Sequence, residues 1–263
     1  MKPQILFCNI LVSTFLISGL AVAQAPLGLN DNTQPTDFSG KSGSEKKPTL
    51  SKSYSANGAI TGLAADEDSD DPCYLELKYV DVVTRQPQNS IKFAHCSGKD
   101  GNPKDGVATA RRDINLTGGR MATGVRVVLN KDGDKIKGIQ LLGNFGECAL
   151  GAKEFTLAVS DCSSVFGAAP YRPDTLEYRL CNTGNQPSSI TVSCNDSRVK
   201  SDPWFERTNA VGAKKGPDSD WDKTVSCPNG MVATGMQMNV RDSGGDRQMI
   251  NGLALECNTL KVR

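Results

Sequence analysis

The sequence predicts an all-β domain built from three related units around one axis, and three observations lead to this prediction. Apolar and polar residues alternate over short stretches, which is the pattern of half-buried strands. Clusters of Gly, Asn and Asp separate these stretches, as tight turns require. One hairpin sequence occurs twice. A β unit with one apolar face cannot bury that face alone, whereas three units about an axis can share a core.

The clearest hairpin lies between Cys227 and Cys257. Two strand candidates, Met231–Val240 and Ile250–Glu256, flank a turn at Arg241–Asp246 that contains two consecutive glycines. Glycine adopts the positive φ values at which a chain reverses without steric cost. We therefore predict a β-hairpin here, and a disulfide between the two cysteines would staple it.

An earlier hairpin repeats this sequence. Its strand candidates are Gly118–Leu129 and Lys135–Leu142, and an Asp-Gly turn joins them. Met121–Val125 matches Val232–Met236, and both segments contain Ala-Thr-Gly. Because the two hairpins share this motif, we predict that they are copies of one unit.

The spacing of the two copies predicts where a third should lie. Half of the interval between the Ala-Thr-Gly triplets falls near Arg179, which corresponds to roughly 55 residues per unit. There Leu176–Leu180 and Ser189–Ser193 flank a turn rich in Gly and Pro, and Cys181 and Cys194 enclose it. We expect a third, more divergent copy at this place.

The chain divides into three parts. Residues 1–23 contain an early lysine, an apolar stretch and small residues before Gln24, the order of a secretory signal peptide. Residues 24–71 are polar and contain few large apolar side chains, so we predict a flexible linker. Residues 72–263 then form the β domain, in which Tyr74–Val83 and Ile91–Ala94 are further strand candidates. No stretch after the signal is long enough to span a membrane, and the expected location is secreted, periplasmic or cell-surface.

The cysteine content supports export. Of nine cysteines, Cys8 would leave with the signal, and an even number in an exported chain argues for disulfides. Pairing between sequence neighbours is the simplest scheme, because each pair then flanks a turn-rich segment. The expected pairs are Cys73–Cys96, Cys148–Cys162, Cys181–Cys194 and Cys227–Cys257.

The charge and the metal-ligating residues exclude several functions. The net charge is +1 and the basic residues are dispersed, so we expect no nucleic-acid partner. A zinc site is not expected, because no two cysteines have Cys-X-X-Cys spacing and His95 is the single histidine. The acidic run at Asp66–Asp71 lacks the glycine and the closing glutamate of a calcium loop, so a solvated loop is favoured. We expect neither a metal nor a cofactor.

The C-terminal hairpin resembles the vitelline membrane outer layer protein family. The shared pattern is a tryptophan, a Cys-Pro-X-Gly motif, an alternating strand, a glycine-rich turn and a closing cysteine. It comprises Trp221, Cys227, Pro228, Gly230, Gly245, Asp246, Asn251, Gly252, Leu255 and Cys257. The resemblance implies a threefold β-prism with a disulfide spanning each repeat, and an extracellular structural or carbohydrate-related role. In the earlier hairpin, Leu116 and Gly143 stand where the paired cysteines would be.

Catalysis has little support in the sequence. His95 and Cys96 are adjacent, but neighbouring residues on a strand point to opposite faces, and Cys96 is expected in a disulfide. A hydrolase whose carboxylates come together from distant positions is the third hypothesis. We expect that the protein is not an enzyme.

Sugar binding is the favoured function, since a sugar needs planar polar groups for its hydroxyls and an apolar ring for its C–H face. The candidate ligand-binding residues are Asp246, Asn251, Gly245, Trp221, Asp134, Asn130 and Trp204. Each has a structural alternative: Asp, Asn and Gly support turns, and the tryptophans can belong to the core. Two acceptor sequences for glycosylation, at Asn115 and Asn195, matter only if the organism glycosylates exported proteins.

We therefore predict a secreted or cell-surface binding module of lectin type, with a glycan or an extracellular protein as partner. The alternative is a passive structural or protein–protein interaction protein of the matrix or envelope. Exposure of the two tryptophans separates these hypotheses, because a sugar site leaves at least one of them accessible to solvent.

Overall fold

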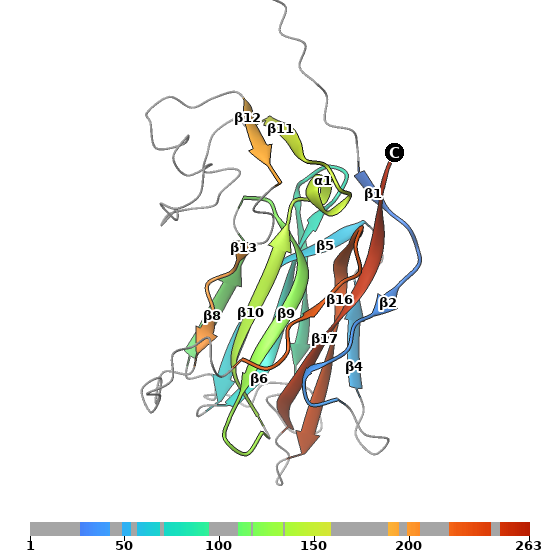
Figure 1. The fold of residues 1–263 in the computed structure, drawn as a ribbon. Helices are drawn as coiled ribbons and strands as arrows, with labels where there is room; N and C mark the ends of the chain where they lie inside the picture. Colours follow the sequence, from blue (N-terminus) through green and yellow to red (C-terminus); the bar gives the residue numbers. More distant parts are fainter. Residues whose placement is uncertain are drawn as a thin grey trace, which may run out of the picture.

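The strands form three antiparallel sheets around a shared core, with a separate two-stranded sheet at one end (Figure 1). The computed structural model describes residues 27–42, 49–53, 57–68, 71–94, 110–116, 118–133, 135–158, 189–194, 199–205, 221–242 and 248–263. The predicted all-β, β-prism-like class is confirmed. The predicted signal peptide lies outside the described residues.

Each large sheet contains one central hairpin and shorter strands at its edges. Sheet I has the order β7-β6-β5-β8, from β5 (Gly58–Asp68), β6 (Asp71–Asp81), β7 (Pro87–Ala94) and β8 (Ala110–Asn115). Sheet II contains β9 (Met121–Leu129), β10 (Ile136–Asn144), β13 (Val199–Lys200), β14 (Trp204–Phe205) and β15 (Val225–Ser226). Sheet III contains β1 (Leu27–Leu29), β2 (Gln34–Pro35), β3 (Ser39–Gly40), β4 (Thr49–Ser53), β16 (Met231–Asp242) and β17 (Gln248–Val262). The remaining elements are α1 (Gly146–Ala149), β11 (Glu154–Ala158) and β12 (Ser189–Ser193).

The three central hairpins are equivalent, and a β-bulge identifies the equivalent positions. In β9–β10 the register shifts beside Thr123, and in β16–β17 it shifts beside Thr234, the two threonines of the Ala-Thr-Gly triplets. In β5–β6 the register shifts in the same way beside Thr61, within Ile60-Thr61-Gly62. Bulges insert one residue and increase the local twist. The third copy of the unit is therefore β5–β6.

The predicted position of the third copy was wrong. Ser189–Ser193 is β12, which pairs with β11 outside the three large sheets, and Leu176–Leu180 lies outside the described residues. Halving the interval between the two triplets assumed units of equal length. The chain instead carries a long insertion between β10 and β15, so the third copy lies before the other two.

The predicted linker at residues 24–71 was also wrong, because this segment supplies β1 to β5. The polar composition of the segment is typical of a disordered chain. However, β1 to β4 are short edge strands held by main-chain hydrogen bonds, which polar residues form as well as apolar ones. Some of the apolar residues that this segment does contain are fully buried, including Ile60 and Leu63.

Each repeat donates its first strand to the sheet of the preceding repeat. β8 precedes the second hairpin but pairs with β5 of sheet I, and β15 precedes the third hairpin but pairs with β9 of sheet II. The same main-chain bond recurs, from Leu116 N to Thr61 O at 2.8 Å and from Cys227 N to Thr123 O at 2.9 Å. β4 precedes the first hairpin and pairs with β16, which closes the ring on sheet III.

The core lies between the three sheets and repeats the same positions. Leu77, Leu141 and Leu255 occupy equivalent places on the second strand of each hairpin, and all three are fully buried. The predicted Cys227–Cys257 disulfide is confirmed and belongs to this core, with both cysteines buried.

The second repeat replaces this disulfide with an apolar contact. Leu116 and Gly143 stand at the positions equivalent to Cys227 and Cys257, as the sequence indicated. The Leu116 side chain fills the space that a Cβ on Gly143 would occupy. The packing is thus conserved in shape between the repeats although the covalent bond is absent.

The bulge threonines provide a test of the repeat. Thr61 and Thr234 donate their hydroxyls to the carbonyls of Lys78 and Glu256, both at 3.4 Å. The equivalent hydroxyl of Thr123 is buried and has no hydrogen-bond partner among the described residues. Thr123→Val, which keeps the shape and removes the hydroxyl, is therefore expected to be neutral or to raise the free energy of unfolding by about 1 kcal/mol.

The matched variant Thr234→Val loses a hydrogen bond and is expected to lower that free energy by about 0.5–1 kcal/mol. Urea denaturation of both variants measures the difference. An equal loss in the two would contradict this account of Thr123.

Candidate binding face

The predicted ligand-binding residues do not form one site among the residues that the structure describes. Gly245, Asp246 and Asp134 lie outside the described residues. Trp204 lies in β14 and pairs with Ile139, and it is only 2% exposed in the central core. Its prediction as a surface ring was wrong, because its strand position places it on the inner face of sheet II.

Asn251 and Asn130 have structural roles. Asn251 is buried, and its Oδ1 accepts a hydrogen bond from Asn239 Nδ2 at 2.6 Å. Asn239 Nδ2 also donates to the Ser42 carbonyl at 3.2 Å, so the pair fixes the chain after β3 against sheet III. Asn130 Oδ1 accepts from Lys135 N at 3.2 Å and closes the β9–β10 turn. These contacts favour the structural alternative for both residues.

Trp221 remains half-buried on the outer face of sheet II. It forms an isolated bridge with Val128 at the edge of β9, and the Arg126 guanidinium lies 4.4 Å from the centroid of its ring. Such a cation–π contact restrains both side chains. Trp221 is therefore an oriented aromatic ring at the sheet surface.

A row of side chains continues from Trp221 across the sheet. Arg126 Nε donates to Gln140 Oε1 at 2.8 Å, and Gln140 Nε2 donates to the Ser201 carbonyl at 2.9 Å. This row, here called the Trp221 row, comprises Trp221, Arg126, Gln140 and Ser201. It crosses from the β15 edge over β9 and β10 to the chain between β13 and β14. Gln140 and Ser201 are buried, so the outer face carries the ring and the cation, and the Gln140 amide links the cation to the main chain of Ser201.

The residue after Trp221 holds this segment to the neighbouring strands through hydrogen bonds. Asp222 N donates to the Val127 carbonyl at 2.9 Å, and the Asp222 carboxylate accepts from Gly40 N. Ser39 Oγ accepts from Val127 N at 3.0 Å. These bonds join the segment to β9 of sheet II and β3 of sheet III, so the ring is held in place before any ligand arrives.

The outer faces of the other sheets carry different side chains. On sheet I, Lys78 forms an ion pair with Asp113 at 2.6 Å, and Tyr74 donates to Glu76 at 3.4 Å. On sheet III, Gln237 Nε2 donates to Glu256 Oε1 at 3.2 Å. The contact between the Trp221 ring and the Arg126 guanidinium thus distinguishes the outer face of sheet II from those of sheets I and III.

Sequence reasoning missed Arg126 and Gln140. A signal was present, because Val125 and Val127 alternate with Arg126 in the predicted strand and are both fully buried. The alternation places Arg126 on the opposite, outward face. The sequence could not show that Arg126 contacts Trp221, because the two residues are far apart along the chain.

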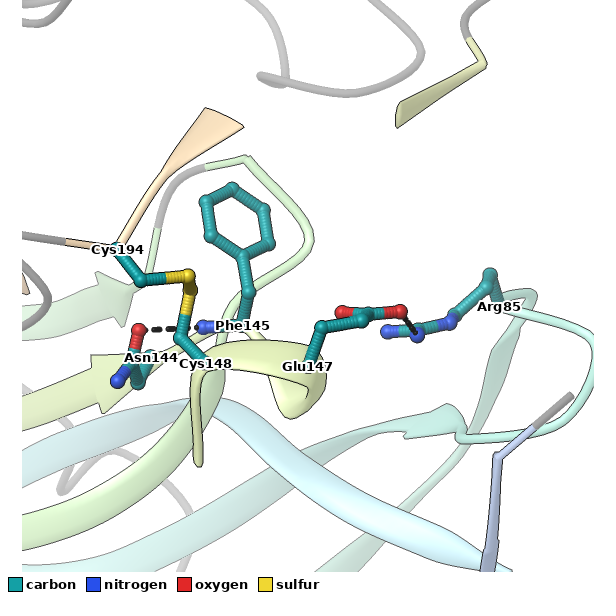
Figure 2. The surroundings of a disulfide bond; sticks show 6 residues. All are labelled: Arg85, Asn144, Phe145, Glu147, Cys148 and Cys194. Atoms are coloured by element: carbon teal, nitrogen blue, oxygen red, sulfur yellow. Dashed lines mark hydrogen bonds and ion pairs between the residues drawn. A yellow bond between two sulfur atoms is a disulfide. The ribbon is translucent and has the colours of Figure 1, made fainter. Parts of the chain in front are cut away.

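The end of the domain that contains α1 is held by a disulfide and an ion pair. Cys148 of α1 bonds to Cys194 after β12, with a Cα–Cα distance of 5.4 Å (Figure 2). Glu147 pairs with Arg85 of the β6–β7 turn, and both side chains are largely buried. The predicted pairs Cys148–Cys162 and Cys181–Cys194 were therefore wrong. Pairing by sequence proximity failed because β11 and β12 bring distant residues together.

Metal and membrane sites are not found within the described part of the chain. No group of His, Cys, Asp and Glu there could hold a metal ion. No helix there is long and apolar enough to cross a membrane. His95 and Cys96, and with them the predicted Cys73–Cys96 pair, lie outside the described residues.

No protein-family model matches this sequence, and no curated protein matches it. Among solved structures, it aligns with the agglutinin of Calystegia sepium at 10% identity and a TM-score of 0.37, over 87% of this chain and 97% of that chain. It aligns with Calsepa lectin in complex with a biantennary N-glycan at 9% identity and a TM-score of 0.38, over 87% and 97%. It aligns with the biofilm matrix protein Bap1 of V. cholerae at 9% identity and a TM-score of 0.30, over 89% of this chain and 24% of that chain.

These TM-scores carry no argument about ligand or function. The β-prism-like description of this chain depends on its own strand pairing. The resemblance to vitelline membrane outer layer proteins stays a prediction.

Proposed function

We propose that this chain is an exported carbohydrate-binding module, and that its ligand lies across the outer face of sheet II. One observation carries the proposal: of the two tryptophans, Trp221 alone is partly exposed, and Arg126 holds its ring in one orientation. A ring that is already ordered loses little side-chain entropy when a ligand binds. The guanidinium beside it carries hydrogen-bond donors that suit hydroxyl groups, and the buried Gln140 amide holds that guanidinium in place.

Export is supported by two features. The predicted signal peptide precedes the described domain, and two disulfides lie among the described residues, a type of bond that persists in oxidising compartments. Both fit a secreted, periplasmic or cell-surface location.

Tryptophan fluorescence tests the proposal, because Trp204 is buried and its emission is expected to be insensitive to ligand. Addition of a binding oligosaccharide is expected to change the emission of the wild-type protein and of Trp204→Phe. Trp221→Phe is expected to abolish the change. Trp221→Ala is expected to weaken binding, measured by calorimetry, at least about tenfold, since a central aromatic contact contributes about 2 kcal/mol.

The structural or protein–protein interaction module is the second candidate. It is favoured by the internal hydrogen bonds of Asn130 and Asn251, which turn two predicted sugar contacts into supports of the fold. A glycan array with no positive spot, on protein whose β spectrum is intact by circular dichroism, would favour this candidate and remove carbohydrate binding.

A further inference from the structure

We infer that a strap formed by residues 27–42 positions Trp221, and that it acts through Asp222. This inference rests on the proposed function and specifies how the affinity of that site is set. The strap contains β1, β2 and β3 and runs along β17 from Val262 to Gly252 (Figure 1). It belongs to sheet III, whereas Trp221 bridges to β9 of sheet II. Contacts between the strap and the Trp221 segment therefore cross from one sheet to the next.

Four residues form this link, here called the Val127 junction: Ser39, Gly40, Val127 and Asp222. Val127 N donates to Ser39 Oγ at 3.0 Å, and the Val127 carbonyl accepts from Asp222 N at 2.9 Å. The Asp222 carboxylate accepts from Gly40 N, and Gly40 directly follows Ser39 in the chain. The four residues thus close a ring of contacts in which β9, the strap and the Trp221 segment hold one another.

The junction is adjacent to both partners of the Trp221 contact. Asp222 follows Trp221 in the chain, and Val127 follows Arg126, whose guanidinium contacts the indole ring. Ser39 is fully buried, so water does not take over its hydrogen bond while the strap is docked. The strap therefore restrains the ring and the guanidinium through the main chain of their neighbours.

The strap has the features of a segment that opens locally. It is held along β17 by main-chain bonds such as Thr36 N to Leu255 O and Lys41 N to Asn251 O, both at 2.9 Å. The side chains of residues 31–35 are exposed. Segments with few buried apolar side chains open while the rest of a protein stays folded. The strap thus has a docked and an open state, and only the docked state closes the junction.

Ligand binding and strap docking are therefore coupled. A ligand that stacks on the ordered Trp221 ring binds the docked state in preference to the open state, and so stabilises the strap by mass action. The coupling is reciprocal, so loss of a junction contact weakens ligand binding. Asp222 carries the coupling, because it is the member of the junction that adjoins Trp221 in the chain.

A second contact between the same two segments provides the control. Lys223 Nζ forms an ion pair with Asp37 at 3.2 Å, and both side chains are exposed. Exposed ion pairs contribute little to stability. Lys223→Gln thus removes a link between the strap and the Trp221 segment outside the junction, whereas Asp222→Ala removes one within it.

The first experiment measures the ring without a ligand. In Trp204→Phe all tryptophan emission comes from Trp221, and acrylamide is the quencher. Asp222→Ala in this background is expected to raise the quenching constant and to lower the fluorescence anisotropy, because the ring moves more freely. Asp222→Asn keeps an acceptor oxygen and is expected to restore much of the difference. Ser39→Ala is expected to act in the same direction as Asp222→Ala, and Lys223→Gln to match the parent. Circular dichroism checks that each variant is folded, and Ser39→Ala carries the comparison if Asp222→Ala is not.

The second experiment measures the coupling with whichever of cellohexaose, chitohexaose and mannohexaose binds the wild type most tightly. At about 100 times its Kd, this oligosaccharide is expected to slow hydrogen exchange at the Thr36 and Lys41 amides about 100-fold, since it binds the docked state. The Arg85 amide, which is bonded within the β6–β7 turn of sheet I, is the control and is expected to be unchanged. Calorimetry is expected to show about three- to tenfold weaker binding in Asp222→Ala and unchanged binding in Lys223→Gln.

The outcomes separate the inference from the proposed function. If Asp222→Ala and Lys223→Gln leave the quenching of Trp221 equally unchanged, the strap does not position the ring, and carbohydrate binding stands. If an oligosaccharide binds but leaves exchange at Thr36 and Lys41 unchanged, the coupling is absent and the inference fails. If neither these oligosaccharides nor any glycan on an array binds the folded wild type, the proposed function fails, and the first experiment alone decides whether Asp222 positions Trp221.

Discussion

Replacing Gly252 with alanine is expected to lower the free energy of unfolding by about 3–5 kcal/mol. Gly252 pairs with Gly40, so β3 passes directly over it. A Cβ at residue 252 would overlap the carbonyl oxygen of Lys41 and lie 3.0 Å from both the N and the C atom of that residue. All three atoms belong to the backbone, so no side-chain rotation can relieve the contact, and β3 must move away.

The size of the effect follows from what β3 would lose. Its bonds are Lys41 N to Asn251 O at 2.9 Å, Val127 N to Ser39 Oγ at 3.0 Å, and Gly40 N to the Asp222 carboxylate. Each such bond contributes about 1 kcal/mol, and overpacking of a well-ordered site costs about 1–3 kcal/mol.

Thermal and urea unfolding measure this loss, with Gly119→Ala as the matched control. Gly119 has a positive φ, which Gly252 does not have, and a Cβ at residue 119 would meet no atom within 4 Å. Its replacement is therefore expected to cost only about 1 kcal/mol of backbone strain. Equal losses in the two variants would show that the close approach of β3 is not what requires glycine at residue 252.

Removal of the buried disulfide is the second large effect. Cys227 and Cys257 are separated by 30 residues, and closing a loop of this length lowers the entropy of the unfolded chain by an amount worth about 3–4 kcal/mol. Both sulfurs lie in the central core. The double variant Cys227→Ala/Cys257→Ala is therefore expected to lower the melting temperature of the domain by about 10 °C, at about 2–4 °C per kcal/mol for a domain of this size.

The other disulfide provides the contrast. Cys148 and Cys194 are separated by 46 residues, so loop entropy alone would give this bond a slightly larger effect. However, β11 and β12, which lie within its loop, pair only with each other among the described strands. An isolated two-stranded sheet is marginally stable. Cys148→Ala/Cys194→Ala is therefore expected to release this arm and leave the main unfolding transition within about 2 °C of wild type.

Differential scanning calorimetry and hydrogen exchange distinguish the two expectations. Faster exchange confined to β11 and β12 would support the local effect. A loss of stability in the Cys148–Cys194 variant as large as in the Cys227–Cys257 variant would show that loop length, not packing, decides the contribution of each bond.

The fold class could be predicted because short stretches of sequence are enough to recognise the repeated hairpin. Alternation placed β9, β10 and β16 to within a few residues and found the first half of β17, which runs six residues beyond the predicted end at Glu256. The shared Ala-Thr-Gly identified the two hairpins as copies. The first repeat escaped because its motif is Ile60-Thr61-Gly62, inside a segment with the composition of a linker. Edge strands of two to five residues carry too little sequence to show a period, and their pairing partners are distant in the chain.

The candidate site was less predictable than the fold. Trp221 was identified from its residue type, and Trp204 was identified on the same grounds although it belongs to the core. Residue type alone cannot separate these two cases, because burial depends on the face of a strand. The contact between Trp221 and Arg126 requires β9 and the segment before β15 to lie side by side, and only the tertiary structure supplies that fact.

The cyclic sharing of strands has a consequence for synthesis of the protein. Sheet III is assembled from β1 to β4 near the start of the chain and from β16 and β17 near its end. A ribosome makes the early segments long before their partners exist. These early strands consequently stay unpaired until residues 231–262 emerge, and a nascent or shortened chain exposes open sheet edges of the kind that chaperones and proteases recognise.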